Sequence, residues 1–332
     1  MQTIDLKTIK SKLYNQIKAV EFAQLPISDY NKNYIQRLLP ALSYYLEIYC
    51  QCIRYGLSKT DKKAEDLILV DFGGGSGFLS MLAKESGIGK VIYIDLNEKS
   101  VETVKCLSNV IETGPDYILH GDAAKLGEWC KKNNIKPDLL LSTDVIEHIY
   151  DLSVFFKELM VINNQMQMIF TTASSPYNPY VKRRLRRLMQ GCEIGVLEQP
   201  NYFQKRADFI RKSFPTLTNE EVNEWIALTR GLVYDDIQKA ISQNTRPKIT
   251  DKYNTCDPET GNWAERILPI KEYRNLMRVY DFKVEVKKGF YNVKRNSKWK
   301  SLLFTSANTC IRCSGKGGLI ISPFIFLLFS HK

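Results

Sequence analysis

A cluster of glycines in the first half of the chain stands directly after an apolar run. The stretch VDFGGGSGFLS, residues 70–80, places Gly73, Gly75 and Gly77 at alternate positions behind Asp71. Glycine lets a backbone turn tightly and approach a ligand closely. The stretch therefore predicts a small-molecule site.

Four common cofactors are bound by such a loop: a dinucleotide, a nucleoside triphosphate, a flavin and S-adenosylmethionine. The lysine of the triphosphate-binding pattern GxxxxGK[ST] is missing from residues 73–80. The dinucleotide pattern GxGxxG is broken because Phe78 takes the place of its third glycine. S-adenosylmethionine carries an ammonium and a sulfonium and no phosphate, and an acidic strand end such as Asp71 suits those cations. The loop therefore favours S-adenosylmethionine.

Further carboxylates follow the next apolar runs. Asp95 ends VIYID, where a carboxylate can accept both hydroxyls of a ribose, in NAD as well as in S-adenosylmethionine. Asp122 follows YILHG, where it can accept from an adenine amino group. Asp144 lies in STDVIEHIYDL, residues 142–152. Ligands of parallel sheets bind outside the carboxyl ends of the strands, so we expect these side chains to surround one site.

The elements that must position these residues alternate in type. Helices of ten or so residues separate short apolar runs, a pattern that predicts βαβ units and a parallel sheet with helices on both faces. The predicted strands are residues 67–72, 91–95, 117–122, 138–145 and 165–172, followed late in the chain by 282–291 and 321–329.

Two helical regions flank this core. Residues 1–60 have apolar residues at helical spacing, and residues 173–268 show several helical segments and no clear strand. An insertion of that length is usually a lid or a binding element. We therefore expect four parts: a helical N-terminal segment (1–60), a cofactor-binding core (61–172), a helical insertion for the acceptor (173–268) and a C-terminal completion of the sheet (269–332).

Four motifs, in order, resemble those of the class I S-adenosylmethionine-dependent methyltransferases: VDFGGGSG, VIYIDLN, HGDAAKL and LLLSTDVIEHI. The resemblance covers about residues 66–172, with weaker support at 270–330. It implies an α/β fold, a seven-stranded, mostly parallel, doubly wound sheet of order 3-2-1-4-5-7-6 whose last strand is antiparallel. It also implies that S-adenosylmethionine is the cofactor.

The resemblance assigns the cofactor contacts to the strand ends. The glycine backbone would pass close to the methionine portion and Asp71 would lie near its ammonium. Asp95 would hold the ribose, and Asp122 with the Ala123 amide would contact the adenine. Asp144 would line the methionine and acceptor side. The full expected set is Asp71, Gly73, Gly74, Gly75, Gly77, Asp95, Leu96, Asp122, Ala123 and Asp144.

His148 is the candidate catalytic residue. A histidine near the transferred methyl group can act as a general base. Glu147 beside it is a candidate acceptor contact. The sequence EHI fits equally well a structural role at the start of the next helix.

A basic run and a polar loop could also recognise the acceptor. YVKRRLRRLMQ, residues 180–190, would expose Arg183 and Arg184 on a helix, either to an anionic acceptor or simply to solvent. NTCDPETGNWAERILP, residues 254–269, reads as a loop that could reach back over the site. Its candidate contacts are Asn262, Trp263, Glu265 and Arg266, and the alternative is a loop packed around its tryptophan.

The composition is that of a globular protein. Of the 332 residues, 44% are hydrophobic, 11% aromatic and 25% charged. The formal net charge of +11 fits nucleic acid, an anionic membrane or an acidic substrate, or merely solubility. Only Cys310 and Cys313 form a CxxC pair and the chain has three histidines, so we expect no metal site. Reduced thiols fit a cytoplasmic protein.

The ends of the chain give no sign of export. MQTIDLKTIKSKLYN lacks the apolar segment of a signal peptide. The apolar stretch 319–329 is shorter than the roughly 20 residues of a membrane span. We expect a buried terminal strand there, with peripheral membrane contact as the alternative.

These observations together predict an S-adenosylmethionine-dependent methyltransferase. The acceptor is expected to be a small molecule or a carbohydrate, with an anionic one as an option, and the methyl group is expected to pass in line to an oxygen. One alternative is an RNA methyltransferase using the basic insertion, although no single-strand-binding module is recognisable. The other is a non-catalytic S-adenosylmethionine-binding regulatory protein. The oligomeric state is not indicated.

Overall fold

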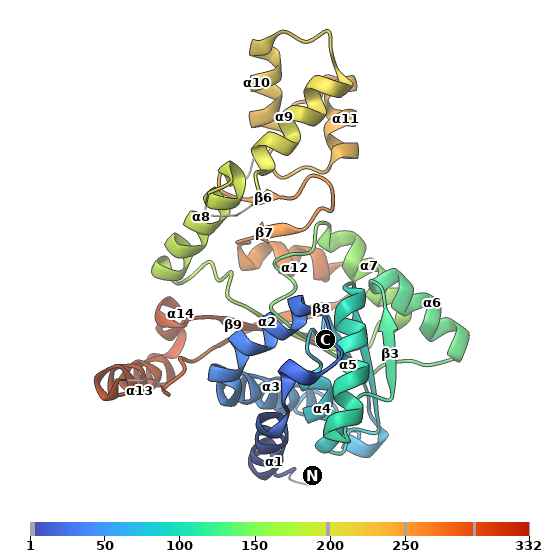
Figure 1. The fold of residues 1–332 in the computed structure, drawn as a ribbon, viewed down its shortest axis with the longest axis vertical. Helices are drawn as coiled ribbons and strands as arrows, with labels where there is room; N and C mark the ends of the chain where they lie inside the picture. The colour runs from blue at the N-terminus through green and yellow to red at the C-terminus, as the bar shows by residue number, and fades with distance from the viewer. Residues whose placement is uncertain (1–3, 197–199, 249–250, 295–296, 332) are drawn as a thin grey trace.

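A central seven-stranded sheet organises the chain in the computed structural model, which describes residues 4–196, 200–248, 251–294 and 297–331. The strand order is β3-β2-β1-β4-β5-β9-β8. Strands β1 to β5 are mutually parallel where they pair, and β9 runs antiparallel to both β5 and β8. With β8 and β9 as the sixth and seventh strands, the predicted order and the antiparallel last strand are confirmed (Figure 1). The strands are β1 Ile68–Phe72, β2 Lys90–Asp95, β3 Tyr117–His120, β4 Leu139–Thr143, β5 Gln167–Thr172, β8 Phe282–Lys288 and β9 Ile325–His331.

The last two strands differ in extent from the prediction. Strand β8 ends at Lys288, and Gly289 after it donates one more hydrogen bond across to the Phe324 carbonyl (3.0 Å). Strand β9 begins only at Ile325, since Gly318–Ile321 form a short helix, α14, and Ser322 turns the chain. The apolar part of β9, as far as Phe329, is fully buried between two neighbouring strands.

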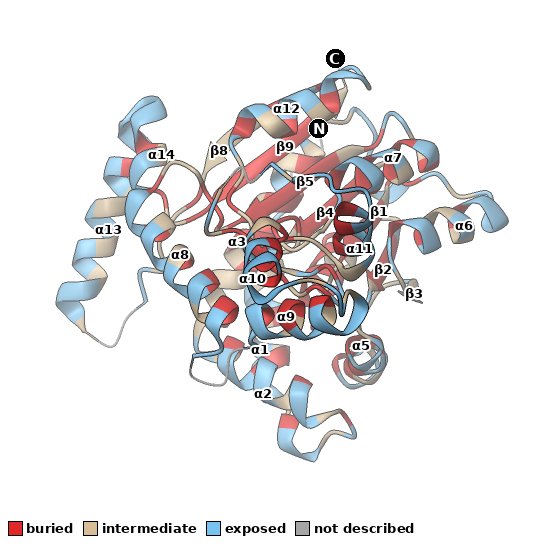
Figure 2. Cartoon of the chain, turned by 90° about the horizontal axis from the view of Figure 1, so that it is seen from above, coloured by how far each residue is buried: buried red, intermediate tan, exposed pale blue. Residues whose placement is uncertain are grey.

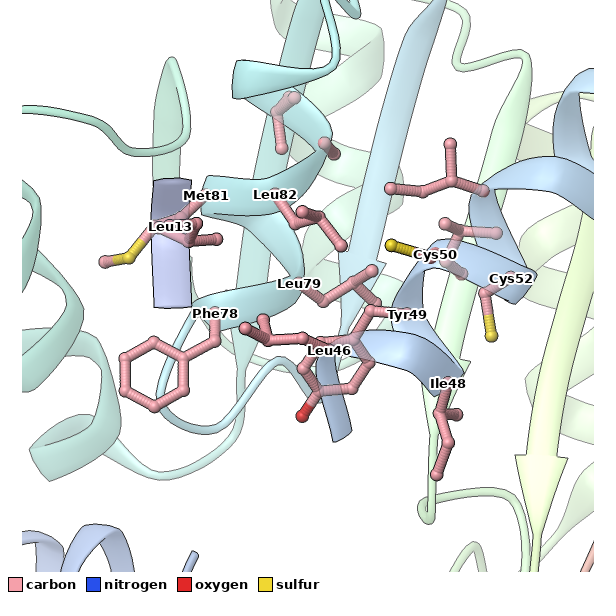
Figure 3. Packing of buried hydrophobic residues seen from close by; sticks show 14 of the residues in the cluster. Leu13, Leu46, Ile48, Tyr49, Cys50, Cys52, Phe78, Leu79, Met81 and Leu82 are labelled. Carbon is pink, nitrogen blue, oxygen red and sulfur yellow. The ribbon is translucent and has the colours of Figure 1, made fainter. Parts of the chain in front are cut away.

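Helices cover both faces of the sheet, as the alternating pattern requires. One face packs against α1 Leu6–Ala19, α3 Leu42–Leu57 and α4 Phe78–Glu85. Figure 3 shows the centre of this layer, where Leu13 of α1, Leu46 and Tyr49 of α3 and Leu79 of α4 meet. The other face packs against α6 Ala123–Asn133, α7 Leu152–Ile162 and α12 Ile270–Arg278. The helices α2 Asp29–Leu38 and α5 Glu98–Ile111 pack on each other, and Asn31 donates a hydrogen bond to Thr103 (2.8 Å).

The insertion stands above the carboxyl ends of the strands (Figure 1). It consists of α8 Pro179–Ile194, α9 Tyr202–Ser213, α10 Asn219–Leu228 and α11 Tyr234–Ser242. The prediction that this region has no strand is wrong, because β6 Thr255–Cys256 and β7 Trp263–Glu265 form a small antiparallel pair. Two- and three-residue strands are too short to leave an alternating pattern in the sequence.

A further helix, α13 Lys298–Cys313, lies at the side of the sheet after β8. Short 3₁₀ helices complete the chain at Phe22–Gln24, Leu39–Ala41, Ala64–Asp66 and Gly315–Gly317. Within the described ranges, no helix combines the length and the apolar composition needed to cross a bilayer.

Candidate functional site

A cavity of about 900 Å³ opens at the carboxyl ends of β1, β2 and β4. Its walls come from the strand ends, from α2, from the first turns of α6 and α7, and from the loop after β6. This is the position where the strand order reverses from β1 to β4, the usual ligand position of such sheets.

The glycine loop brings backbone to the floor of the cavity. Gly73 and Gly75 line it, whereas Gly74 and Gly77 lie behind, against Tyr93 and Val104. Gly77 caps α4 with a φ of +74°, and a Cβ there would lie 2.7 Å from a methyl of Val104. That position therefore requires glycine.

The Asp95 carboxylate holds the loop from the next strand. One oxygen accepts from the Gly75 N–H (2.9 Å) and the other from the Asn97 N–H (2.8 Å). Asp95 and the exposed Leu96 both line the cavity. A carboxylate oxygen has two lone pairs, so Asp95 can still accept from hydroxyl groups in the cavity, as the ribose assignment requires.

Asp71 is not among the described residues that line the cavity. Its carboxylate is buried and accepts from the backbone N–H (3.0 Å) and the hydroxyl (2.7 Å) of Ser80. Burial raises the pKa of Asp71 to about 7, against the lowering effect of these two donors. Asp71 therefore joins β1 to α4 in this structure, and its predicted place near an ammonium stays a prediction.

The residues predicted to contact the adenine lie in the cavity wall formed by the start of α6. Asp122 caps α6 by accepting from the Lys125 N–H (3.0 Å), and both Asp122 and Ala123 line the cavity. The first backbone N–H groups of a helix have no partner within the helix, so the Ala123 amide is available to a ligand. The exposed Val154 and the buried Phe155 of α7 add an apolar surface nearby.

Asp144 lies at the end of β4, opposite the glycine loop. Its φ is +54°, a left-handed conformation that aspartate adopts more readily than most residues. It lines the cavity and is exposed there. Desolvation, and after it the charge of Glu265, raises the pKa of Asp144 to about 6.

His148 is held in one orientation by the chain segment that returns from the insertion. Its Nδ1 lies 2.8 Å from the carbonyl oxygen of Trp263, and its own carbonyl accepts from the Trp263 N–H (3.3 Å). A carbonyl oxygen only accepts hydrogen bonds, so Nδ1 carries the hydrogen and Nε2 of the neutral ring keeps a lone pair. His148 lines the cavity.

Trp263 and Arg266 form a stack behind this wall. The Arg266 guanidinium lies 4.7 Å from the centre of the Trp263 ring, which in turn stacks on Tyr150. Arg266 also donates to the Tyr150 carbonyl (3.0 Å). Both residues support the cavity-lining segment 148–150, and neither is among the lining residues. Their acceptor contacts stay predictions.

Glu147 is buried, and it too is not among the lining residues. One of its carboxylate oxygens has no hydrogen-bond partner among the described residues. Burial, and after it the charge of Asp144, raises the pKa of Glu147 well above its usual range. Burial therefore favours the protonated form of this side chain, which lies in the core beside Thr172.

Arg183 and Arg184 lie on the exposed face of α8, and neither is among the described residues that line the cavity. The run splits as an amphipathic helix does: Val181 and Leu185 are buried while these arginines are exposed. Their predicted contact with an acceptor stays a prediction.

The structure adds wall residues that the sequence motifs did not indicate. Tyr30, Asn31 and Tyr34 of α2 close one side of the cavity, and Thr260 joins the predicted Asn262 on another. Burial and the nearby Asp144 raise the pKa of Tyr34 to about 12. These residues are far in sequence from the glycine loop, and their helical spacing gives no sign that they face a ligand.

Part of the chain is similar to a known family. Residues 70–162 match the sequence model of a family described as a methyltransferase domain. A search of curated protein sequences finds no significant match.

Solved structures with a similar arrangement are distant in sequence. A ribosomal protein L11 methylase from Lactobacillus delbrueckii subsp. bulgaricus is 20% identical, with 37% of this chain covering 58% of that one (TM-score 0.28). A SAM dependent methyltransferase from Archaeoglobus fulgidus is 13% identical over 86% of this chain and 93% of that one (TM-score 0.39). One from Mesorhizobium loti is 13% identical over 84% and 96% (TM-score 0.39).

Proposed function

We propose that the chain is a class I S-adenosylmethionine-dependent methyltransferase and that it methylates an oxygen of a small-molecule or carbohydrate-type acceptor. Residues 70–162 match a methyltransferase domain, and the seven-stranded sheet has the strand order expected for that class. The oriented imidazole of His148 in the cavity wall is the observation that carries it.

The residues around the cavity fit the cofactor. The loop at Gly73 and Gly75 offers close-approaching backbone, and Asp95 offers an acceptor for two hydroxyls. Asp122 and the Ala123 amide offer one acceptor and one donor to a base. When bound, the sulfonium of S-adenosylmethionine supplies an activated methyl group, and the protein aligns the acceptor and excludes water.

His148 provides the base that an oxygen acceptor needs. A hydroxyl must lose its proton as its oxygen is methylated, and a neutral imidazole can take that proton. The Trp263 carbonyl fixes the hydrogen on Nδ1. Nε2 of His148 then accepts the hydroxyl proton, and the imidazolium later releases it to solvent.

The charge of the cavity favours a neutral acceptor. None of the described residues that line it is a lysine or an arginine, and its titratable carboxylates are Asp95, Asp122, Asp144, Asp151 and Glu158. A phosphorylated acceptor would meet these carboxylates without a compensating cation. This argues against the anionic and RNA acceptors that the basic run suggested, and for a neutral hydroxyl compound.

Release of S-adenosylhomocysteine tests the proposal. The protein is incubated with S-adenosylmethionine and a panel of neutral sugars and alcohols, phosphorylated sugars, carboxylic acids and RNA. We expect turnover with a neutral hydroxyl acceptor. Turnover confined to RNA or to carboxylic acids would contradict the proposal, and absence of turnover together with normal cofactor binding would favour a regulatory protein.

His148→Asn tests the base itself. The asparagine amide can still donate to the Trp263 carbonyl but offers no basic nitrogen. We expect kcat to fall by about 10²–10⁴, with S-adenosylmethionine affinity unchanged. His331→Asn is the matched control. His331 lies at the carboxyl end of β9, which runs antiparallel to β5 and so ends on the side of the sheet away from the cavity, and this variant should retain full activity.

A further inference from the structure

Helix α13 carries two apolar faces. The inner face packs against the rest of the protein. Phe304 on this face stacks on Tyr291 (ring centroids 4.9 Å apart), and Ile311 is buried. Asn308 fixes the same side by exchanging hydrogen bonds with the Tyr291 backbone. These residues, three or four positions apart, define one side of the helix.

The outer face is apolar as well, and it is exposed. Trp299, Leu302 and Leu303 are 81%, 58% and 64% exposed. Their spacing of three and four residues places them together on one stripe, which the exposed Cys310 and Cys313 continue at helical spacing. Large apolar side chains grouped on a surface mark a site of interaction. In Figure 1, α13 and α14 lie at the periphery of the molecule, beside the sheet edge.

The charge around this stripe has one sign. Lys298 and Lys300 flank Trp299 and are exposed, and Arg312 and Lys316 follow at the other end of the helix. From residue 286 to residue 332 the sequence has no aspartate or glutamate, against nine lysines and arginines. An amphipathic helix with tryptophan and leucine on one face and lysine beside them is the pattern that binds at the interface of an anionic bilayer.

The chain leaves the sheet for this helix at a known edge. Strands β8 and β5 both run antiparallel to β9, so they point the same way, and the carboxyl end of β8 lies at the same edge as the carboxyl ends of β4 and β5. Figure 2 shows α13 at the side of the molecule, coloured exposed over most of its length.

We propose that the outer face of α13, Trp299, Leu302 and Leu303 with Lys298 and Lys300, docks the protein on the surface of an anionic membrane. The apolar side chains enter the boundary between headgroups and acyl chains, and the lysines contact the headgroups. A continuous negative surface matches a segment that carries cations at both ends of the helix and no carboxylate, and this favours a bilayer over a protein partner. The proposal does not depend on the acceptor or on catalysis.

Vesicle flotation of the full chain tests the docking. We expect binding to phosphatidylcholine vesicles that contain phosphatidylglycerol, weak binding to phosphatidylcholine alone, and weakening by high salt. The triple variant Trp299→Ser, Leu302→Ser, Leu303→Ser should lose at least about tenfold in partitioning. Val161→Ser with Val279→Ser, which removes apolar side chains that are 76% and 75% exposed elsewhere, should leave binding unchanged.

Charge and fluorescence add two independent measurements. Lys298→Glu with Lys300→Glu should abolish the preference for anionic vesicles, whereas Lys131→Glu with Lys132→Glu on exposed α6 positions should not. Anionic vesicles should shift the tryptophan emission of the wild type to the blue, and Trp299→Phe should remove most of this shift. Thermal unfolding of each variant reports whether it is folded.

Three results would overturn the proposal. The first is a wild-type protein that does not float with anionic vesicles at low salt. The second is a folded triple variant that binds them as well as the wild type. The third is self-association that the triple variant abolishes, without vesicle binding, since a second copy of the chain would then cover this face.

Discussion

The sheet core and the helical insertion meet at the same cavity but are held together in different ways. In the core, each carboxylate of the site follows its own strand, and short backbone hydrogen bonds fix it, as Asp95 and Asp122 show. Few residues separate each strand from the functional group that it positions. The cofactor side of the cavity is therefore largely a consequence of local sequence.

The insertion has a core of its own and reaches the cavity through one loop. Apolar residues of α9, α10 and α11 pack together, apart from the core of the sheet. The buried Arg206 of α9 pairs with Glu193 of α8, and Glu193 also accepts from Thr255 of β6 (2.6 Å). Among the described residues of this region, only Thr260 and Asn262 line the cavity. We therefore expect that the cofactor side of the cavity and the insertion can be disturbed separately.

Arg206→Met should break the insertion while leaving the cofactor side intact. Removing one partner of a buried ion pair leaves an uncompensated charge, and this costs about 3–5 kcal/mol. We expect hydrogen exchange to show faster opening of α8–α11 and unchanged protection of β1–β5, with cofactor affinity retained. Replacing both partners, Glu193→Leu with Arg206→Met, should recover part of the loss. Equal destabilisation of both regions would show that they form one cooperative unit.

Asp95→Ala should break the cofactor side and leave the insertion intact. The change removes the acceptor for the backbone N–H groups of Gly75 in the loop and of Asn97 after β2, together with the expected ribose contact. We expect a loss of about 2–3 kcal/mol in the binding of S-adenosylmethionine by calorimetry, roughly a 50-fold weakening. Asp116→Ala is the control, because Asp116 accepts from the Val91 N–H at the other edge of the sheet. Unchanged affinity in Asp95→Ala would place the cofactor elsewhere.

Glu147→Gln should make the folded protein more stable than the wild type at high pH. The folded-state pKa of Glu147 is raised, so the folded protein favours the protonated acid, and that contribution is present below the unfolded value of 4.5 and lost as pH rises above it. Glutamine keeps the shape without the titration. We expect the two proteins to be about equally stable in acid and the variant to be more stable, by about 1 kcal/mol or more, in alkali. A pH-independent difference in thermal unfolding would contradict this.

Of these variants, Glu285→Gln should have the smallest effect on the free energy of unfolding, and this effect should be confined to the sheet. Lys59 (2.8 Å) and Lys287 (3.1 Å) lower the pKa of Glu285 to about 2, so its contribution is present above pH 4.5 and lost as pH falls toward 2. The pairs are partly exposed, and we expect a loss of less than about 1 kcal/mol at neutral pH. Denaturant unfolding at several pH values measures it, and a difference that grows in acid would have the wrong sign.

Much of the core could be predicted from the sequence because its signals are local. The strands before Gly73, Asp95 and Asp144 are short apolar runs, each followed by a turn, and the alternation with helices leaves few topologies open. The family resemblance supplied the strand order, including two strands separated from the others by more than a hundred residues.

Other features could not be predicted because they depend on contacts between distant segments. Tyr30 and Tyr34 occupy an amphipathic helix, and nothing in its periodicity tells which sheet edge it covers. The β6–β7 pair is too short for a pattern, and the return of Trp263 onto His148 joins residues 115 positions apart. Helix α13 buries only Ile311 fully, so the apolar residues of its inner face give only a weak helical periodicity in the sequence.

Hydrogen exchange with and without S-adenosylmethionine tests the central claim most directly. The account predicts slower exchange at Gly73–Gly77, around Asp95–Asn97 and at the start of α6, with Tyr30–Tyr34 of α2 also protected. Exchange in α9–α11 should not change. Protection concentrated in α9–α11, or none in the glycine loop of a folded protein, would contradict the division between a cofactor-binding core and a separate insertion.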